Sequence, residues 1–191
     1  MMIPPSELAF DIDGVFADTM SLFIDIARSD FGITGLKYED ITEYDLCTLA
    51  GIDAGIYIDI IMCILEGRHS GTLKEIEGAS DVLKRVNQRH CPTLFVTARP
   101  NADQVYGWIL DTLCLEPEKI DIVATGSFED KQQALLKNGI KYFVEDRLET
   151  CFTLSDAGIQ PIVFKQPWNR KPHPFCEVAN WQELESLISF D

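Results

Sequence analysis

The chain has 191 residues, of which 46% are hydrophobic, and its formal net charge is −15. This length and composition fit one ordinary domain, or one domain with a modest insertion, with ample material for a packed core. The negative charge argues against nucleic acid and against anionic membranes as partners, because the summed field repels both. Any anion site must therefore be built locally, from a metal, backbone N–H groups and a few basic residues.

Six cysteines are spread along the chain, with only three histidines. No C-x-x-C pair occurs, so a zinc cluster is not expected. Residues 1–7 contain neither a basic nor a long apolar leader region, and the most apolar long stretch, 56–65, is too short to span a bilayer. We expect a protein of the reducing cytoplasm whose thiols are small buried side chains.

The first predicted element is a short buried strand, Leu8–Phe10, and Gly14 permits a sharp turn after it. Asp11 and Asp13 follow the strand. On an extended segment, side chains two residues apart share a face and lie roughly 6–7 Å from each other. Two such carboxylates repel unless a cation or a proton lies between them, so the pair suits metal binding, acid–base chemistry or both. The plainer alternative is a strand end followed by an Asp-Gly turn.

Residues 17–78 predict two helices, 19–28 and 53–66, and no clear strand. From residue 79 onward helices and strands alternate, with helices at 80–89, around 105–113, 131–138, 147–157 and 181–188, and strands at 93–96, 120–124, 142–144 and 161–164. This alternation predicts an α/β fold, a Rossmann-like parallel sheet with helices on both faces. We assign 1–16 and 79–191 to this core, and 17–78 to a small helical cap inserted after the first strand.

Ligands of open parallel sheets bind at the carboxyl ends of the strands. In chain order, these ends carry Asp11 and Asp13, then Thr97-Ala98-Arg99, then a loop and helix bearing Lys131, and last Glu145-Asp146-Arg147. Carboxylates, a hydroxyl and a lysine at one edge suit a divalent cation that holds a phosphorylated group. Each residue alone has a plainer interpretation: Thr97 as a helix cap, Lys131 as a solvated helix residue, and Glu145-Asp146 as a capping pair.

The four segments resemble, in order, the motifs of the haloacid dehalogenase superfamily: DIDGV, FVTAR, the lysine of EDKQQ, and FVEDR. The resemblance covers residues 7–16 and 79–165, with an insertion where that superfamily often carries its first type of cap. The second Asp of the pair makes the chain resemble the phosphatase branch rather than the dehalogenases, which lack a general acid at that position. Within the superfamily, DITEYDL, FVEDR and QPWNR at 166–170 resemble the 5′(3′)-deoxyribonucleotidase group and its bacterial relatives.

This resemblance implies a phosphomonoesterase that depends on Mg²⁺. Asp11 would be the nucleophile that forms an aspartyl-phosphate, and Asp13 the acid and then the base. Mg²⁺ would be held by the Asp11 carboxylate, the Asp13 main-chain carbonyl and Asp146. Phosphate would be bound by Thr97, Ala98 and Lys131. Arg99 could contact phosphate or pair with an acid, and Glu145 could support the metal ligands from behind.

The implied substrate is a (deoxy)nucleoside monophosphate, but the aromatic residues depart from the group's pattern. Relatives stack the base on cap aromatics that include tryptophan, whereas Trp108, Trp168 and Trp181 all lie outside 17–78. The cap offers Phe23, Phe31, Tyr38, Tyr44 and Tyr57 instead. Of these, Phe23, Tyr44 and Tyr57 are the candidates to pack against a base or sugar, with plain cap core as the alternative for each.

Two other functions stay open at this point. One is a phosphatase of sugar phosphates or other small metabolites. The other is a non-catalytic sensor of a phosphate ligand, against which Asp13 argues because binding alone needs no acid. The exact substrate and the oligomeric state are not determined by these residues.

Overall fold

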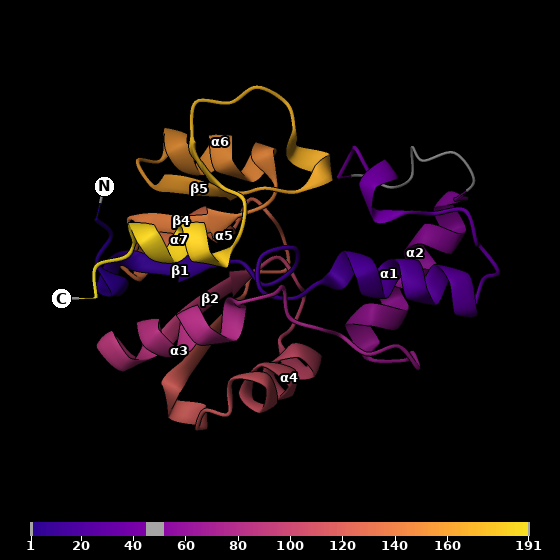
Figure 1. Ribbon diagram of the computed structural model, residues 1–191, viewed down its shortest axis with the longest axis horizontal. Helices are drawn as coiled ribbons and strands as arrows, with labels where there is room; N and C mark the ends of the chain where they lie inside the picture. Colours follow the sequence, from indigo (N-terminus) through magenta and orange to yellow (C-terminus); the bar gives the residue numbers. More distant parts are fainter. Residues whose placement is uncertain (1, 45–51, 191) are drawn as a thin grey trace.

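The computed structural model describes residues 2–44 and 52–190, which contain a six-stranded parallel sheet of order β3-β2-β1-β4-β5-β6 (Figure 1). The strands are β1 (Leu8–Phe10), β2 (Thr93–Thr97), β3 (Ile120–Ala124), β4 (Tyr142–Glu145), β5 (Gln160–Phe164) and β6 (Cys176–Val178). The chain moves outward from β1 in one direction, then returns to β4 and moves outward in the other. The order therefore reverses between β1 and β4, where open sheets of this kind leave a crevice for ligands.

Helices cover both faces of the sheet (Figure 1). On one face lie α3 (Ala79–Arg89), α4 (Asp103–Leu113) and α7 (Trp181–Leu187), and on the other α5 (Lys131–Lys137) and α6 (Leu148–Asp156). Neighbouring residues of β1 point to opposite sides: Phe10 packs in the cluster that contains Trp181, and Ala9 in the cluster that contains Leu135. A strand buried on both faces has no polar side to alternate, which explains why Leu8–Phe10 is apolar throughout.

The expected α/β fold is confirmed, and every expected strand is present. One strand was missed: β6, a three-residue edge strand paired with β5, follows Pro172 and Pro174 and is too short to show periodicity. The expectation of buried thiols was wrong for most of the described cysteines. Cys151 is buried and Cys63 half-buried, whereas Cys91, Cys114 and Cys176 are exposed; Cys47 lies outside the described residues.

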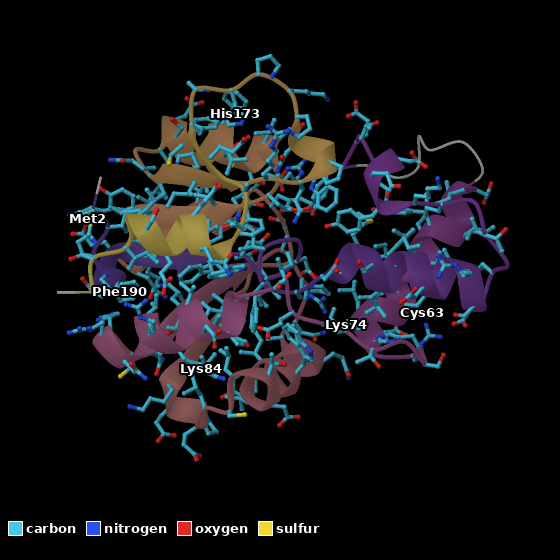
Figure 2. The ribbon with its side chains drawn as sticks, in the orientation of Figure 1. Met2, Cys63, Lys74, Lys84, His173 and Phe190 are labelled. Atoms are coloured by element: carbon cyan, nitrogen blue, oxygen red, sulfur yellow. The ribbon has the colours of Figure 1, made fainter. Side chains whose placement is uncertain are left out.

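The segment between β1 and α3, called here the inserted segment (residues 17–78), carries α1 (Thr19–Ser29) and α2 (Ala54–Glu66). These helices pack on each other in a hydrophobic cluster apart from the sheet, to the right in Figure 1. Two passages of chain join this segment to the core side by side. Ala17 bridges to Glu75, the Asp18 N–H donates to the Lys74 carbonyl at 2.8 Å, and Figure 2 shows Lys74 at this junction.

Within the described ranges, no helix has both the length and the apolar character needed to cross a membrane.

Candidate active site

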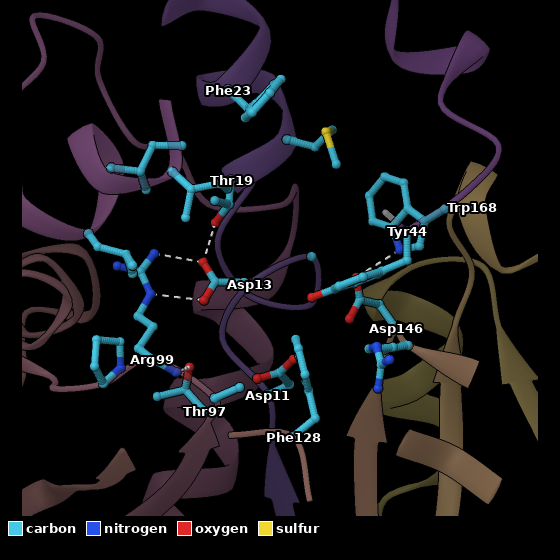
Figure 3. Close-up of a pocket in the computed structure, with 18 of the residues that line it drawn as sticks. Asp11, Asp13, Thr19, Phe23, Tyr44, Thr97, Arg99, Phe128, Asp146 and Trp168 are labelled. Carbon is cyan, nitrogen blue, oxygen red and sulfur yellow. Dashed lines mark hydrogen bonds and ion pairs between the residues drawn. The ribbon is translucent and has the colours of Figure 1, made fainter. Parts of the chain in front are cut away.

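A cavity of about 620 Å³ opens between the carboxyl ends of the central strands and the inserted segment (Figure 3). Its lining includes all six residues predicted for the site: Asp11, Asp13, Thr97, Ala98, Lys131 and Asp146. Asp11, Asp13, Thr97, Ala98 and Asp146 lie at the ends of β1, β2 and β4, and Lys131 is the first residue of α5, which follows β3. The part of the wall contributed by the inserted segment is mostly apolar, with Met20, Phe23, Tyr44, Tyr57, Ile61 and Leu65.

Lys131 is completely buried and lies between two carboxylates. Its Nζ is 2.9 Å from Asp11 Oδ1 and 2.9 Å from Glu145 Oε2. Burial alone would lower the pKa of Lys131, but the charges of Asp11 and Glu145 outweigh it and raise that pKa. Lys131 is therefore a fixed positive charge at the base of the cavity, and the alternative of a solvated helix residue is excluded.

Glu145 holds this lysine and the start of the following loop. Besides Lys131, it accepts the main-chain N–H groups of Asp146 and Arg147 at 3.1 and 3.0 Å through Oε1. Both carboxylate oxygens of Glu145 therefore have hydrogen-bond donors within the protein.

Asp11, Glu145 and Asp146 form a buried acidic cluster in which one oxygen from each lies within 4.8 Å of the others. With Lys131 as the counter-charge, three carboxylates and one ammonium leave a net charge of −2 when all are ionised. Burial, and then the neighbouring charges, raise the pKa of Asp146 well above its usual range, and burial does the same to the pKa of Asp11 although Lys131 opposes it. The buried cluster is therefore short of positive charge.

Asp146 Oδ1 is buried and accepts no hydrogen bond from the described residues. A buried carboxylate oxygen without a partner is costly, so this atom fits the position of a cation ligand. Gly14, at φ +77°, faces the same carboxylate, and a Cβ built there would overlap Asp146 Oδ2. The residues at this edge could therefore hold a divalent cation such as Mg²⁺, to which Asp11 and Asp146 would offer carboxylate oxygens.

Asp13 is held by two other groups (Figure 3). The Arg99 guanidinium donates from Nε to Oδ2 at 2.8 Å and from Nη2 to Oδ1 at 2.6 Å, and Thr19 donates its hydroxyl to Oδ1 at 2.5 Å. Burial opposes ionisation of Asp13, but the charge and hydrogen bonds of Arg99 outweigh burial and lower its pKa. The sequence left two roles open for Arg99, contact with phosphate or pairing with an acid. In the structure Arg99 pairs with an acid, Asp13.

Thr97 ends β2 and is buried at the cavity floor. Its Oγ1 accepts the Arg99 main-chain N–H at 3.2 Å, which leaves the hydroxyl proton to donate to an anion. Ala98 lies next to it in the lining. Thr97 is thus positioned by the turn that follows its strand, and it caps no helix.

Arg147 and Trp168 enter the cavity from the core, and neither was predicted as a site residue. The Arg147 guanidinium lies over Phe128 at 4.3 Å and over Tyr44 at 5.4 Å from the ring centroids. Trp168 donates from Nε1 to Asp146 Oδ2 at 2.9 Å and packs in the cluster of the inserted segment. Both residues belong to sequence motifs that carried the resemblance, FVEDR and QPWNR, but sequence spacing gave no sign of these contacts.

Of the three candidate aromatics of the inserted segment, all line the cavity and all pack in the segment's own cluster. Phe23 is 2% exposed, whereas Tyr44 and Tyr57 are half-buried. The side chain of Tyr44 reaches in between Asp13 and Asp146 (Figure 3). Each of these three side chains therefore both lines the cavity and belongs to the packing of the inserted segment.

Comparison with known proteins identifies the family. A family model described as "5' nucleotidase, deoxy (Pyrimidine), cytosolic type C protein" matches residues 5–190. No curated protein matches the chain.

Solved structures show the same fold at low sequence identity. A Had-superfamily hydrolase from Ehrlichia chaffeensis is 15% identical with a TM-score of 0.57, over 97% of this chain and 97% of that one. CbbY from Rhodobacter sphaeroides in complex with phosphate is 15% identical with a TM-score of 0.59, over 96% of each chain. A mutant of CbbY in complex with xylulose-(1,5)bisphosphate is 15% identical with a TM-score of 0.60, over 96% of each chain.

Proposed function

Because the chain belongs to the family of cytosolic type C 5′ nucleotidases, deoxy (pyrimidine), within the haloacid dehalogenase superfamily, we propose that this phosphomonoesterase uses Mg²⁺ and acts on (deoxy)nucleoside 5′-monophosphates. The observation that carries the proposal is the buried cluster of Asp11, Glu145 and Asp146 around Lys131. The net charge of −2 that it carries when all its groups are ionised, and the unpartnered Oδ1 of Asp146, support a divalent cation at the base of the cavity.

In this proposal Asp11 and Asp146 hold Mg²⁺ together with the main-chain carbonyl of Asp13. When bound, the ion neutralises charge on the phosphoryl oxygens. Lys131 holds the Asp11 carboxylate in place through the 2.9 Å ion pair and adds a fixed positive charge beside it. The phosphate is bound by that ammonium and by the hydroxyl of Thr97, with Ala98 next to it.

The chemical steps rest on the two aspartates. Asp11 attacks phosphorus to form an aspartyl-phosphate, while Asp13 delivers a proton to the leaving oxygen. Asp13 then takes a proton from the water that cleaves the intermediate. The lowered pKa of Asp13 suits the second step, in which it must be ionised. Its bond to Arg99 must loosen for the first step, in which it carries a proton.

We propose that the inserted segment, residues 17–78, acts as a cap over the cavity. In this proposal the leaving group lies against that cap. The apolar wall there includes the rings of Phe23, Tyr44 and Tyr57, and it favours a nucleoside over a sugar, whose hydroxyls would find few partners. A sugar-phosphate phosphatase is the second candidate, since neighbours of the same fold bind phosphate and a sugar bisphosphate. The cytoplasmic location expected from the sequence stays a prediction.

The test is phosphate release from a panel of monophosphates, with and without Mg²⁺. The panel contains deoxy- and ribonucleoside 5′- and 3′-monophosphates, several sugar phosphates and p-nitrophenyl phosphate. We expect kcat/KM to be highest for a nucleotide, and EDTA to abolish release. A preference for sugar phosphates would replace the nucleotidase proposal by the second candidate. Binding of phosphate without any turnover would instead indicate the sensor.

A further inference from the structure

The turn between β5 and β6 reaches back to Asp146 from more than twenty residues away in sequence. Trp168 donates its indole N–H to Asp146 Oδ2 at 2.9 Å. Asn169 donates its side-chain amide to the main-chain carbonyl of Asp146 at 2.7 Å. Two neighbouring residues of one turn thus hold both the side chain and the main chain of Asp146.

These contacts decide which oxygen of Asp146 can face a cation. Oδ2 is occupied by the indole N–H, and Oδ1 has no hydrogen-bond donor among the described residues. A Cβ at Gly14 would overlap the same Oδ2 and would also lie 3.3 Å from the Trp168 ring. The Gly14 backbone and the indole therefore both lie close to Oδ2, which leaves Oδ1 as the oxygen without a protein partner among the described residues.

The indole itself is held firmly. Trp168 is 5% exposed and packs 5.7 Å from the ring of Tyr38. The turn that carries it is closed by Asn169, whose side chain accepts the Gln166 main-chain N–H at 2.9 Å. The Gln166 side chain donates to the Gly14 carbonyl at 2.7 Å and accepts the Tyr38 hydroxyl at 2.8 Å. The indole thus contacts the inserted segment through Tyr38, and Gln166 of the same turn is bonded to the loop that carries Asp13.

We propose that Trp168 is a positioning residue for the metal site: its indole N–H holds Asp146 Oδ2 and thereby directs Oδ1 toward the cation. The inference rests on the Mg²⁺ site of the proposed function. A hydrogen bond to a metal-ligating side chain typically governs affinity, and its loss weakens metal binding about ten- to a hundredfold.

The first test compares Trp168→Phe with Trp108→Phe by calorimetric titration with MgCl₂. Both variants keep an aromatic ring and lose one indole N–H bond, since Trp108 donates to the Leu73 carbonyl at 3.0 Å. We expect Mg²⁺ affinity to fall about ten- to a hundredfold in Trp168→Phe and to stay at the parent value in Trp108→Phe. Equal affinity in parent and Trp168→Phe would overturn the inference and reduce Trp168 to a packing residue.

The second test uses the unaltered protein, so it does not depend on the variant folding. The chain has three tryptophans, so a spectrum of ¹⁵N-labelled indoles has three N–H signals. On addition of MgCl₂ we expect the Trp168 signal to move most, because the carboxylate that accepts its N–H through Oδ2 becomes a metal ligand through Oδ1. A Trp168 signal that stays in place while calorimetry records binding would contradict the inference. Absence of any Mg²⁺ binding to the parent would instead count against the proposed function.

Discussion

Arg99, in the turn that follows β2, donates hydrogen bonds to both carboxylate oxygens of Asp13, at 2.8 and 2.6 Å. The pair joins two strand ends and is partly shielded from solvent, since the Arg99 side chain is 6% exposed and the Asp13 side chain 26% exposed. A bidentate guanidinium fixes the plane of the carboxylate as well as its charge. The residue proposed as acid and base is thus oriented from the core, before any contribution from a leaving group.

Replacing Arg99 by Met should move the pH profile of activity. Arg99 lowers the pKa of Asp13, so its loss raises that pKa. The leaving-group acid works in its protonated form, and activity falls as pH rises through its pKa. We therefore expect the alkaline limb of kcat/KM for an alkyl phosphate to shift to higher pH in Arg99→Met. The matched control is Arg28→Met, which removes an exposed ion pair on α1 and should leave the pH profile unchanged. An alkaline limb that does not move in Arg99→Met would mean that Arg99 does not set the pKa of Asp13.

Asp11→Asn should abolish turnover and stabilise the metal-free protein. The amide is nearly isosteric but cannot attack phosphorus. Burial raises the pKa of Asp11, so the folded metal-free state retains a proton that the unfolded chain has released. Because the folded state binds this extra proton, the free energy of unfolding of the parent falls as pH rises above about 4. In EDTA, the difference in Tm between variant and parent should grow from pH 4 upward. Turnover at the parent rate would refute the nucleophile.

Asp13→Asn should impair substrates according to their leaving groups. Release of phosphate from an alkyl ester should fall by roughly 10²–10⁴, because the acid is lost. p-Nitrophenolate needs little protonation, so single-turnover phosphorylation by p-nitrophenyl phosphate should fall much less. Mg²⁺ affinity should change little, since the proposed metal contact is the main-chain carbonyl. Equal losses of phosphorylation rate for both esters would mean that Asp13 is not the leaving-group acid.

Tyr44 and Phe23 should respond differently to replacement by Leu. Tyr44 lines the cavity and reaches in between Asp13 and Asp146 (Figure 3), so Tyr44→Leu should raise KM for a nucleotide and spare a small aryl phosphate. Phe23 is 2% exposed, so Phe23→Leu should lower Tm and affect both substrates together. Steady-state kinetics with thermal unfolding of each variant measures the difference. If neither variant distinguishes the two substrates, the nucleotidase proposal loses its support from the inserted segment.

The sheet could be predicted because each buried strand is a short apolar run between helices, and because parallel topology brings strand ends to one edge. That rule was enough to gather Asp11, Thr97, Lys131 and Asp146 around one cavity. It could not predict β6, whose three residues are too few for a pattern.

Side-chain contacts between distant segments were also beyond the sequence. Trp168 lies outside the inserted segment in sequence yet packs in its cluster, because the turn before β6 folds back over Asp146. The thiols were misjudged because a cysteine's average tendency to be buried says nothing about which side of a helix or turn it occupies. Contacts of this kind depend on how distant segments are placed in three dimensions, and the periodicity of hydrophobic residues in the sequence does not report that placement.

The missing Cβ at Gly14 couples positions 14 and 146. While Asp146 is present, a side chain at position 14 collides with it and also requires an unfavourable φ. Removal of the carboxylate at 146 would relieve the collision but not the unfavourable φ. A side chain at position 14 would therefore be less damaging in a protein that lacks Asp146, and the effects of the two substitutions on stability would not add.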